Sequence, residues 1–339
     1  MRQRTLLLRV GLQVLAVRAE PESIRDSRQT LIVHWLVYPV KLVPMKTQMD
    51  GITRRSFLGS AALAAAAATT SAAGRVSKLR FGFTTYQWGV DWDILTLITN
   101  CTKAKALGVE LRTTAKYKHG VEIDISDARR GEVKKIFADS PVKLVGIASS
   151  ERFDSPDAAK LAAAIEGAKA HVKLSHDVGA TGVRVFPNDF HKEVPEEQTI
   201  AQIAKALNAV GKFAADYGQM VRLENHGSAG RLTTVRKILD RVDQKNVRVK
   251  LNSDAKDAVG NSFTKNFALV KDRLGDTLHM HELGDSEFPY ELQWSLLIAQ
   301  GWEGWCFVEN SAKVPDRAQA LIEQHRIWDE MIARASRSS

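Results

Sequence analysis

The 339-residue sequence contains only two cysteines and no apolar run long enough to cross a bilayer. Two cysteines cannot supply the dense cross-linking of small secreted domains. Cys101 and Cys306 both fall in segments that read as core, so we expect two buried thiols, with a disulfide as the alternative for an exported protein. The alanine-rich run from Ala61 to Ala68 is much shorter than the ~20 residues of a membrane span, so we expect no stable membrane anchor.

The folded part of the chain also lacks a marked excess of one charge sign. The formal net charge is +9, but residues 1–73 hold ten Lys or Arg against four Asp or Glu. Residues 74–339 hold 38 basic and 35 acidic residues. A nearly neutral folded part argues against a nucleic-acid partner, which would require a basic surface.

The basic leader has the pattern of an export signal. Thr53-Arg54-Arg55-Ser56-Phe57-Leu58 precedes the alanine-rich run, and small residues follow it. Residues 49–73 therefore resemble a twin-arginine signal peptide, although Gly59 stands where a lysine is common. We expect export to the periplasm by this route. Met49 directly precedes the signal, so residues 1–48 are interpreted as an upstream extension that is disordered or not native.

Residues 74–339 show no composition break and no glycine-rich phosphate turn after the first strand candidate. Short aliphatic runs alternate with amphipathic stretches of helical spacing. Eight strands are expected, at 79–83, 108–113, 143–149, 182–187, 220–225, 247–252, 277–283 and 305–310. Helix candidates include 158–179, 199–218, 233–242, 263–274, 291–301 and 316–335, and glycines at 108, 179, 218 and 301 are placed as helix C-caps.

Eight strands alternating with helices over about 265 residues are typical of a single-domain (β/α)8 TIM barrel. A doubly wound open sheet is the alternative, but it would normally carry a glycine-rich turn after its first strand. The stretch FGFTTYQWG at 81–89 has no such turn. We therefore expect the barrel.

Polar residues end the last four predicted strands. Strand five ends with Glu224, strand six with Asn252 and Asp254, strand seven with a histidine pair, and strand eight with Glu309. Strand ends meet at one mouth of a barrel, where TIM-barrel active sites lie. Carboxylate, imidazole and amide ligands suit Mn²⁺, Co²⁺ or Zn²⁺ and also admit Mg²⁺, so we expect one divalent metal ion.

The histidine pair, His279 and His281, is separated by one residue, so both side chains should point to the same face of the strand. Counted from the predicted strand starts, His281 lies at the depth of Glu224 and Glu309. We expect His281 to be the metal ligand and His279 to be a buried neighbour that supports the site, with the reverse assignment as the alternative.

This order of residues resembles the xylose isomerase-like TIM barrels, the sugar phosphate isomerase/epimerase superfamily. The resemblance covers about residues 79–335 and implies that Glu224, a strand-six ligand, a strand-seven histidine and Glu309 bind one divalent metal. It also implies that the two glutamates exchange a proton with the carbon next to a metal-bound carbonyl. Strand six departs from the family, which usually has an aspartate there, so either Asn252 or Asp254 supplies the ligand.

The resemblance implies a metal-dependent sugar isomerase or epimerase acting on a small carbohydrate. The alternatives are a metal-dependent lyase or hydrolase of glycosides or oxidised sugars and a non-catalytic sugar-binding barrel. The oligomeric state is left open and includes a homodimer or homotetramer. Further candidates for substrate contacts are His226, Glu110, Arg112, His279 and Trp88. For His226 the alternative is a residue that only orients its loop, and for Trp88 it is a lid over the core. For Glu110 and Arg112 a mutual salt bridge is the favoured interpretation.

Overall fold

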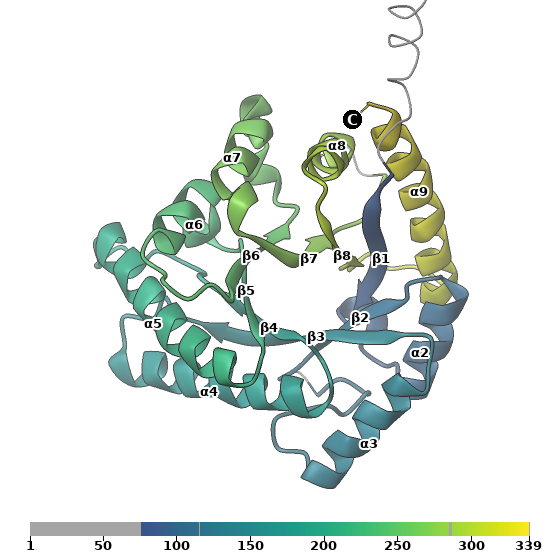
Figure 1. Cartoon of the computed structure of the whole chain (residues 1–339), viewed down its shortest axis with the longest axis horizontal. Coiled ribbons are helices and arrows are strands. Elements are labelled where there is room, and N and C mark those ends of the chain that lie inside the picture. Colours follow the sequence, from purple (N-terminus) through teal and green to yellow (C-terminus); the bar gives the residue numbers. More distant parts are fainter. Residues whose placement is uncertain (1–75, 115, 285–286, 339) are drawn as a thin grey trace, which may run out of the picture. The chain divides into compact units, whose positions relative to one another are not determined.

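The structure is a computed structural model that describes residues 76–114, 116–284 and 287–338. The predicted signal peptide and upstream extension lie outside the described residues. Eight parallel strands pair in chain order and close into a barrel, since β1 also pairs with β8 (Figure 1). The strands are β1 (Lys78–Thr84), β2 (Gly108–Arg112), β3 (Lys143–Arg152), β4 (Gly182–Phe186), β5 (Met220–Glu224), β6 (Val247–Asn252), β7 (Leu274–Met280) and β8 (Glu303–Val308). The predicted barrel is confirmed, and the open sheet is wrong.

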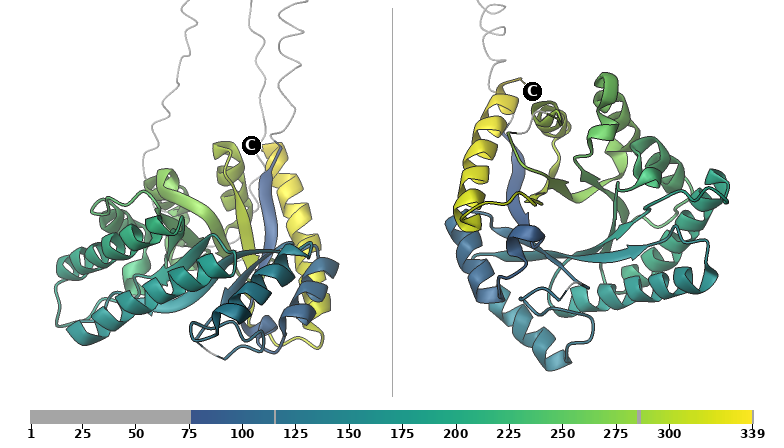
Figure 2. Two further views of the ribbon diagram at one scale, coloured as in Figure 1. Left: turned by 60° about the horizontal axis from the view of Figure 1, so that its bottom comes forward. Right: turned by 180° about the vertical axis from the view of Figure 1, so that it is seen from behind.

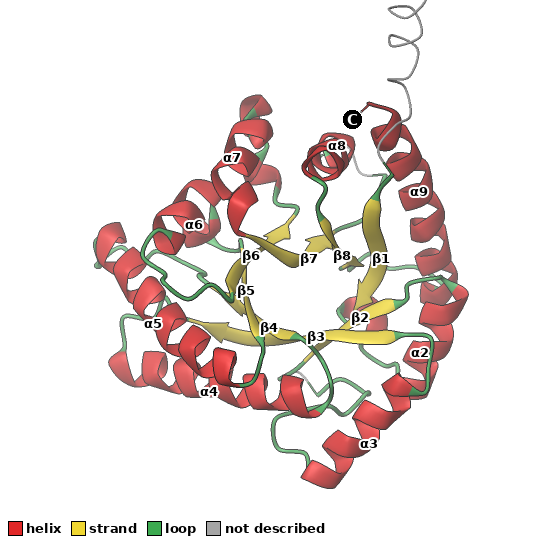
Figure 3. Ribbon diagram, viewed as in Figure 1, coloured by secondary structure: helices red, strands yellow, loops and turns green. Residues whose placement is uncertain are grey.

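Helices surround the strands, as the colouring by secondary structure in Figure 3 shows. They are α2 (Ile94–Lys103), α3 (Asp127–Ala138), α4 (Ala158–Asp177), α5 (Glu196–Asp216), α6 (Leu232–Leu239), α7 (Phe263–Val270), α8 (Tyr290–Gln300) and α9 (Arg317–Ser338). Side-chain caps fix several of their starts. Asp157 precedes α4 and accepts hydrogen bonds from the backbone amides of Ala159 and Lys160, at 2.8 and 3.1 Å.

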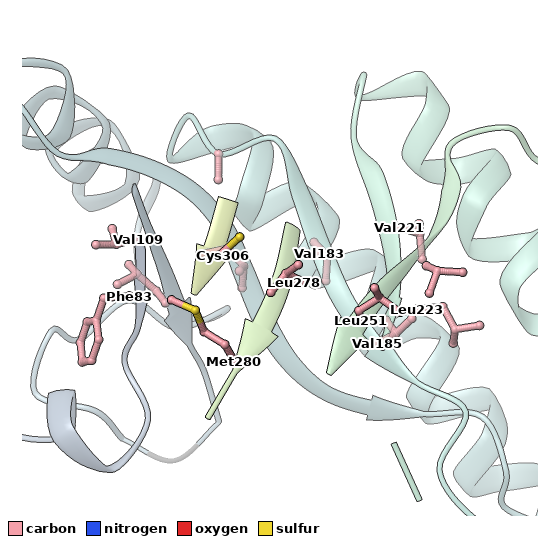
Figure 4. Packing of buried hydrophobic residues seen from close by; sticks show 14 of the residues in the cluster. Phe83, Val109, Val183, Val185, Val221, Leu223, Leu251, Leu278, Met280 and Cys306 are labelled. Atoms are coloured by element: carbon pink, nitrogen blue, oxygen red, sulfur yellow. The ribbon is translucent and has the colours of Figure 1, made fainter. Parts of the chain in front are cut away.

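The outer face of the strands is aliphatic and packs against the helices. Side chains alternate across a strand, so every second residue faces this layer. Figure 4 shows part of it, with Val183 and Val185 from β4 beside Val221 and Leu223 from β5. All four are at most 1% exposed. This layer fixes the direction in which the intervening residues point, which is into the barrel.

The inner face of the barrel holds large and charged side chains, and glycines on nearby strands leave space for some of them. Trp305 of β8 lies against Gly108 of β2, where an added Cβ would be 2.4 Å from the indole ring. Gly108 is the first residue of β2 and not the expected helix C-cap. The other three predicted cap glycines, Gly179, Gly218 and Gly301, do have positive φ angles of 83°, 63° and 70° after their helices.

The last helix, α9, lies beside β1, which the two further views in Figure 2 also show. The ring of Phe81 on β1 is 5.5 Å from that of Trp328 on α9. Cys101 and Cys306 are free and buried, so the expected pair of thiols is confirmed. Within residues 76–114, 116–284 and 287–338, no helix combines the length and apolar character that a membrane span needs.

Candidate metal centre and active site

Three buried side chains meet at the carboxyl ends of the strands. Glu224 is the last residue of β5, His279 lies near the end of β7, and Glu309 directly follows β8. One ligand atom from each lies within 4.8 Å of the others. The Nδ1 atom of His279 is 3.1 Å from Oε2 of Glu224 and 3.2 Å from Oε2 of Glu309. Two carboxylates and an imidazole thus converge on one point.

The charges in this group stabilise one another despite their burial. Burial alone would raise the pKa of Glu224, but the charges of His279 and Arg184 lower this pKa to about 2. Burial likewise opposes ionisation of Glu309, yet His279 and Arg112 hold its pKa well below the usual range. Burial and Lys250 lower the pKa of His279, but the surrounding carboxylates raise it to about 10. Both glutamates are therefore ionised at neutral pH.

One buried polar atom beside this group lacks a hydrogen-bond partner, the Oδ1 atom of Asn252, whereas Nδ1 of His279 faces the two glutamates in ion pairs. Asn252 ends β6 and is the register neighbour of His279. Unpaired buried polar atoms are costly unless a ligand satisfies them. Glu224, Asn252, His279 and Glu309 therefore fit a divalent ion, with the imidazole Nδ1 exchanging a proton for the metal.

A second ion pair supports His279 from below. Its Nε2 atom donates a hydrogen bond to Oε1 of Glu110 at 2.6 Å, and Nζ of Lys250 lies 2.7 Å from both oxygens of that carboxylate. All three side chains are fully buried. The positive charges of Lys250 and His279 outweigh burial and hold the pKa of Glu110 well below its usual value. Glu110 therefore fixes the orientation of the His279 ring, with Nδ1 facing the two glutamates.

A cavity of about 290 Å³ opens above the group. Two arginines line it and contact the glutamates: Nη1 of Arg112 lies 2.5 Å from Oε1 of Glu309, and Nη1 of Arg184 lies 3.2 Å from Oε2 of Glu224. The other lining residues are Tyr86, Phe186, Glu224, His226, Asn252, His281, Glu309 and Ser311. A small polar molecule in this cavity would contact both carboxylates and both guanidinium groups.

The structure reverses the expected order of the two histidines. Strand β7 begins at Leu274, three residues before its predicted start, and ends at Met280. His279 therefore lies at the level of the glutamates, whereas His281 follows the strand and is exposed at the cavity wall. The depths differ from those expected because barrel strands are staggered, so equal counts from the strand starts do not give equal depth. Asp254 caps the next turn through the amide of Lys256 and does not line the cavity, whereas Asn252 does.

The other predicted contacts divide into two sets. Arg112 and His226 line the cavity, and the His226 ring lies 4.7 Å from that of Phe186. Glu110 and Trp88 do not line it. The expected salt bridge between Glu110 and Arg112 is wrong, because Glu110 pairs with Lys250 and Arg112 extends to Glu309. Trp88 is 2% exposed and donates a hydrogen bond from its indole nitrogen to the carbonyl of Ala312, so it covers the core.

Arg184 and Lys250 were not predicted as site residues. Each lies inside an aliphatic strand, in GVRVF and VRVKLN, with hydrophobic neighbours on both sides. In a strand whose alternate residues face a helix layer, a charged residue between them must point into the barrel. A charge that cannot reach water requires a partner of opposite sign. This pattern was a usable signal for both residues.

Comparisons with known proteins agree with this geometry. The family model described as xylose isomerase-like TIM barrel matches residues 98–331. No curated protein matches the chain significantly. A structure of 3-keto-D-glucoside 4-epimerase from E. coli is 15% identical, covers 73% of this chain and 97% of its own, and superposes with a TM-score of 0.59. L-ribulose 3-epimerase is 16% identical, with 77% and 96% covered and a TM-score of 0.65.

A third solved structure is that of IOLI protein with a binding zinc atom. It is 16% identical, covers 75% of this chain and 98% of its own, and has a TM-score of 0.63. At these identities the likeness to the solved structures concerns the fold, whereas the family model spans most of the barrel. The chain therefore belongs to the xylose isomerase-like TIM barrel family.

Proposed function

We propose that the protein is a divalent-metal-dependent sugar isomerase or epimerase in which Glu224 and Glu309 move a proton at the carbon beside the substrate carbonyl. The observation that carries this proposal is the convergence of Glu224, His279 and Glu309 within 4.8 Å at the barrel mouth. The unpaired Oδ1 of Asn252 supplies a fourth donor. The sugar epimerases among the similar structures support the same reaction class.

The two glutamates and the histidine have different roles in this reaction. A divalent ion bound there supplies Lewis acidity toward the substrate carbonyl. Glu224 and Glu309 are ionised, so either can accept a proton from the neighbouring carbon and return it. Delivery of a solvent-derived proton to the opposite face by the other glutamate gives an epimer, whereas return of the removed proton to the adjacent carbon gives an aldose–ketose isomer. His279 is held by Glu110 and orients the donor set.

The first experiment determines the metal and the chemistry together. Elemental analysis of the purified protein is followed by a panel of aldoses, ketoses and glycosides in deuterated water, monitored by NMR. Deuterium at a sugar carbon supports the proposal. New reducing ends would instead indicate a hydrolase, and sugar binding without either change would indicate a binding module.

Substitution of the two carboxylates sharpens the test. Glu309→Gln and Glu224→Gln should each abolish deuterium exchange while the circular dichroism spectrum stays that of the parent. Glu303→Gln is the matched control, because Glu303 starts the same strand as Glu309 and is 59% exposed in a surface pair with Lys78. Unchanged exchange in Glu309→Gln would contradict the assignment.

We also propose that the protein is exported through the twin-arginine pathway to the periplasm, on the basis of Arg54 and Arg55 and the alanine-rich run that follows. This pathway carries folded proteins, so the metal would be bound before export. The replacement of both arginines by lysine should retain the protein in the cytoplasm, as measured by cell fractionation. Continued appearance in the periplasm would refute this route.

A further inference from the structure

Two guanidinium groups dominate the wall of the 290 Å³ cavity. Arg184, in the middle of β4, is 1% exposed, and Arg112, at the end of β2, is 19% exposed. Each is stacked on an aromatic ring: Cζ of Arg184 lies 4.0 Å from the ring centroid of Phe186, and Cζ of Arg112 lies 4.5 Å from that of Tyr86. Stacking fixes the plane of each guanidinium and leaves its edge for hydrogen bonds.

The hydrogen bonds of Arg184 are incomplete. Its Nη1 atom donates to Glu224, but its Nε and Nη2 atoms are buried without any partner. Buried unpaired donors on a charged group are costly, and a bound molecule with acceptor oxygens would remove this cost. Guanidinium N–H pairs match the two oxygens of a carboxylate.

The charge balance points to the same kind of ligand. Glu110 and Lys250 compensate each other beneath the site. Glu224 and Glu309 are the carboxylates among the described residues that line the cavity. A divalent ion bound to these two glutamates would neutralise them. Arg112 and Arg184 would then face the cavity with two uncompensated positive charges, so the bound molecule should itself be anionic.

We propose, on the basis of the function proposed above, that the substrate is a sugar acid whose carboxylate is bound by Arg184 and Arg112. A neutral sugar would leave both guanidinium charges uncompensated. A sugar phosphate is disfavoured, because phosphates are commonly held by backbone amides of glycine-rich loops and, in the described part of the chain, the residues that line this cavity include no glycine. The carbonyl end of the molecule lies toward Glu224 and Glu309, and the acid end lies toward the two arginines.

The test measures binding by isothermal titration calorimetry to protein loaded with Mn²⁺. The probes are D-glucuronate, D-glucose and D-glucose 6-phosphate, which differ at carbon six, together with 2-keto-D-gluconate and D-fructose. We expect at least one of the two acids to bind about tenfold or more tightly than its neutral counterpart. Equal or tighter binding of the neutral sugars or of the phosphate would overturn the proposal.

Variants connect the preference to the two arginines. Arg112→Gln and Arg184→Lys should each lower the preference for the acid over its neutral counterpart, expressed as the ratio of the two affinities, by about tenfold or more. Arg129→Gln, on the exposed face of α3, is the control and should change neither affinity. An acid preference that survives in both arginine variants would overturn the proposal even if one variant were less stable.

Deuterium exchange separates this proposal from the function on which it rests. Exchange on a neutral ketose without any preference for acids would refute the sugar-acid substrate and leave the isomerase standing. Preferential binding of an acid without exchange on any sugar of the panel would refute the isomerase and leave the carboxylate site standing.

Discussion

Replacement of Lys250 by methionine should be among the most destabilising single changes in the barrel. The ammonium group makes two hydrogen bonds of 2.7 Å to Glu110, and both side chains are fully buried. Methionine has nearly the volume of the lysine stem, so the change removes the charge and leaves the packing. Loss of one partner of a buried ion pair costs about 3–5 kcal/mol, because the remaining charge, here Glu110 with His279 still beside it, is less well compensated.

This free energy can be measured and partitioned by a double-mutant cycle. For a barrel of this size, about 3–5 kcal/mol lowers the melting temperature by roughly 6–20 °C. Glu110→Gln restores neutrality in the Lys250→Met background and keeps an oxygen that can accept from His279, so the double variant should recover about half of the loss or more. Lys205→Met, on the exposed side of α5, is the control and should lie within about 0.5 kcal/mol of the parent.

The measurement is urea unfolding followed by tryptophan fluorescence, with all five proteins at the same pH and without added metal. If the free energy of unfolding falls in the double variant by the sum of the two single decreases, Lys250 and Glu110 do not act as a pair. A Lys250→Met protein as stable as the parent would show that Glu110 is neutral in the native state.

Three further perturbations have defined outcomes. His279→Gln should lower metal affinity about tenfold or more while His281→Gln leaves it nearly unchanged, as measured by titration with Mn²⁺; the reverse order would restore His281 as the ligand. Gly227→Ala should lower the free energy of unfolding in urea by about 3 kcal/mol, because φ is +75° and the new Cβ would lie 2.0 Å from a backbone oxygen. Gly120→Ala, with positive φ but open space around it, should lower the free energy of unfolding by about 1 kcal/mol. Equal losses in the two variants would refute the steric argument. Burial lowers the pKa of His119 to about 4 from 6.5, so the unfolded chain takes up the proton first and native stability falls as pH drops from 6.5 toward 4. His119→Gln should reduce the decrease in the free energy of unfolding between pH 6.5 and pH 4 by up to about 3 kcal/mol. An unchanged pH dependence of unfolding would contradict the role of His119.

The fold was predictable because the sequence pattern is periodic and local. Every expected strand overlaps an observed one, and β6 begins and ends at the residues predicted for it. Glu224 and Glu309 were found because each is the polar residue that ends a buried strand. Their convergence with a histidine followed from the topology alone, since strand ends of a closed barrel share one mouth.

The details of the site depended on interactions that a single strand does not reveal. The level of His279 is set by the stagger between β6 and β7, where Asn252 pairs in register with it. The partner of Glu110 is Lys250, far along the chain, and not Arg112, its neighbour on the same strand face. Pairing across a barrel depends on closure and register, which the sequence of either strand cannot specify by itself.

The pair between Glu110 and Lys250 also has a consequence for how the barrel folds. It joins β2 to β6 and links residues 140 positions apart, so it can form only when most of the barrel has closed. A slip of β6 by one residue would turn Lys250 into the aliphatic layer under the helices, which no partial structure could tolerate. Loss of the pair should therefore accelerate unfolding far more than it slows refolding. The buried ion pair therefore forms late in folding and is compatible with only one register of β6.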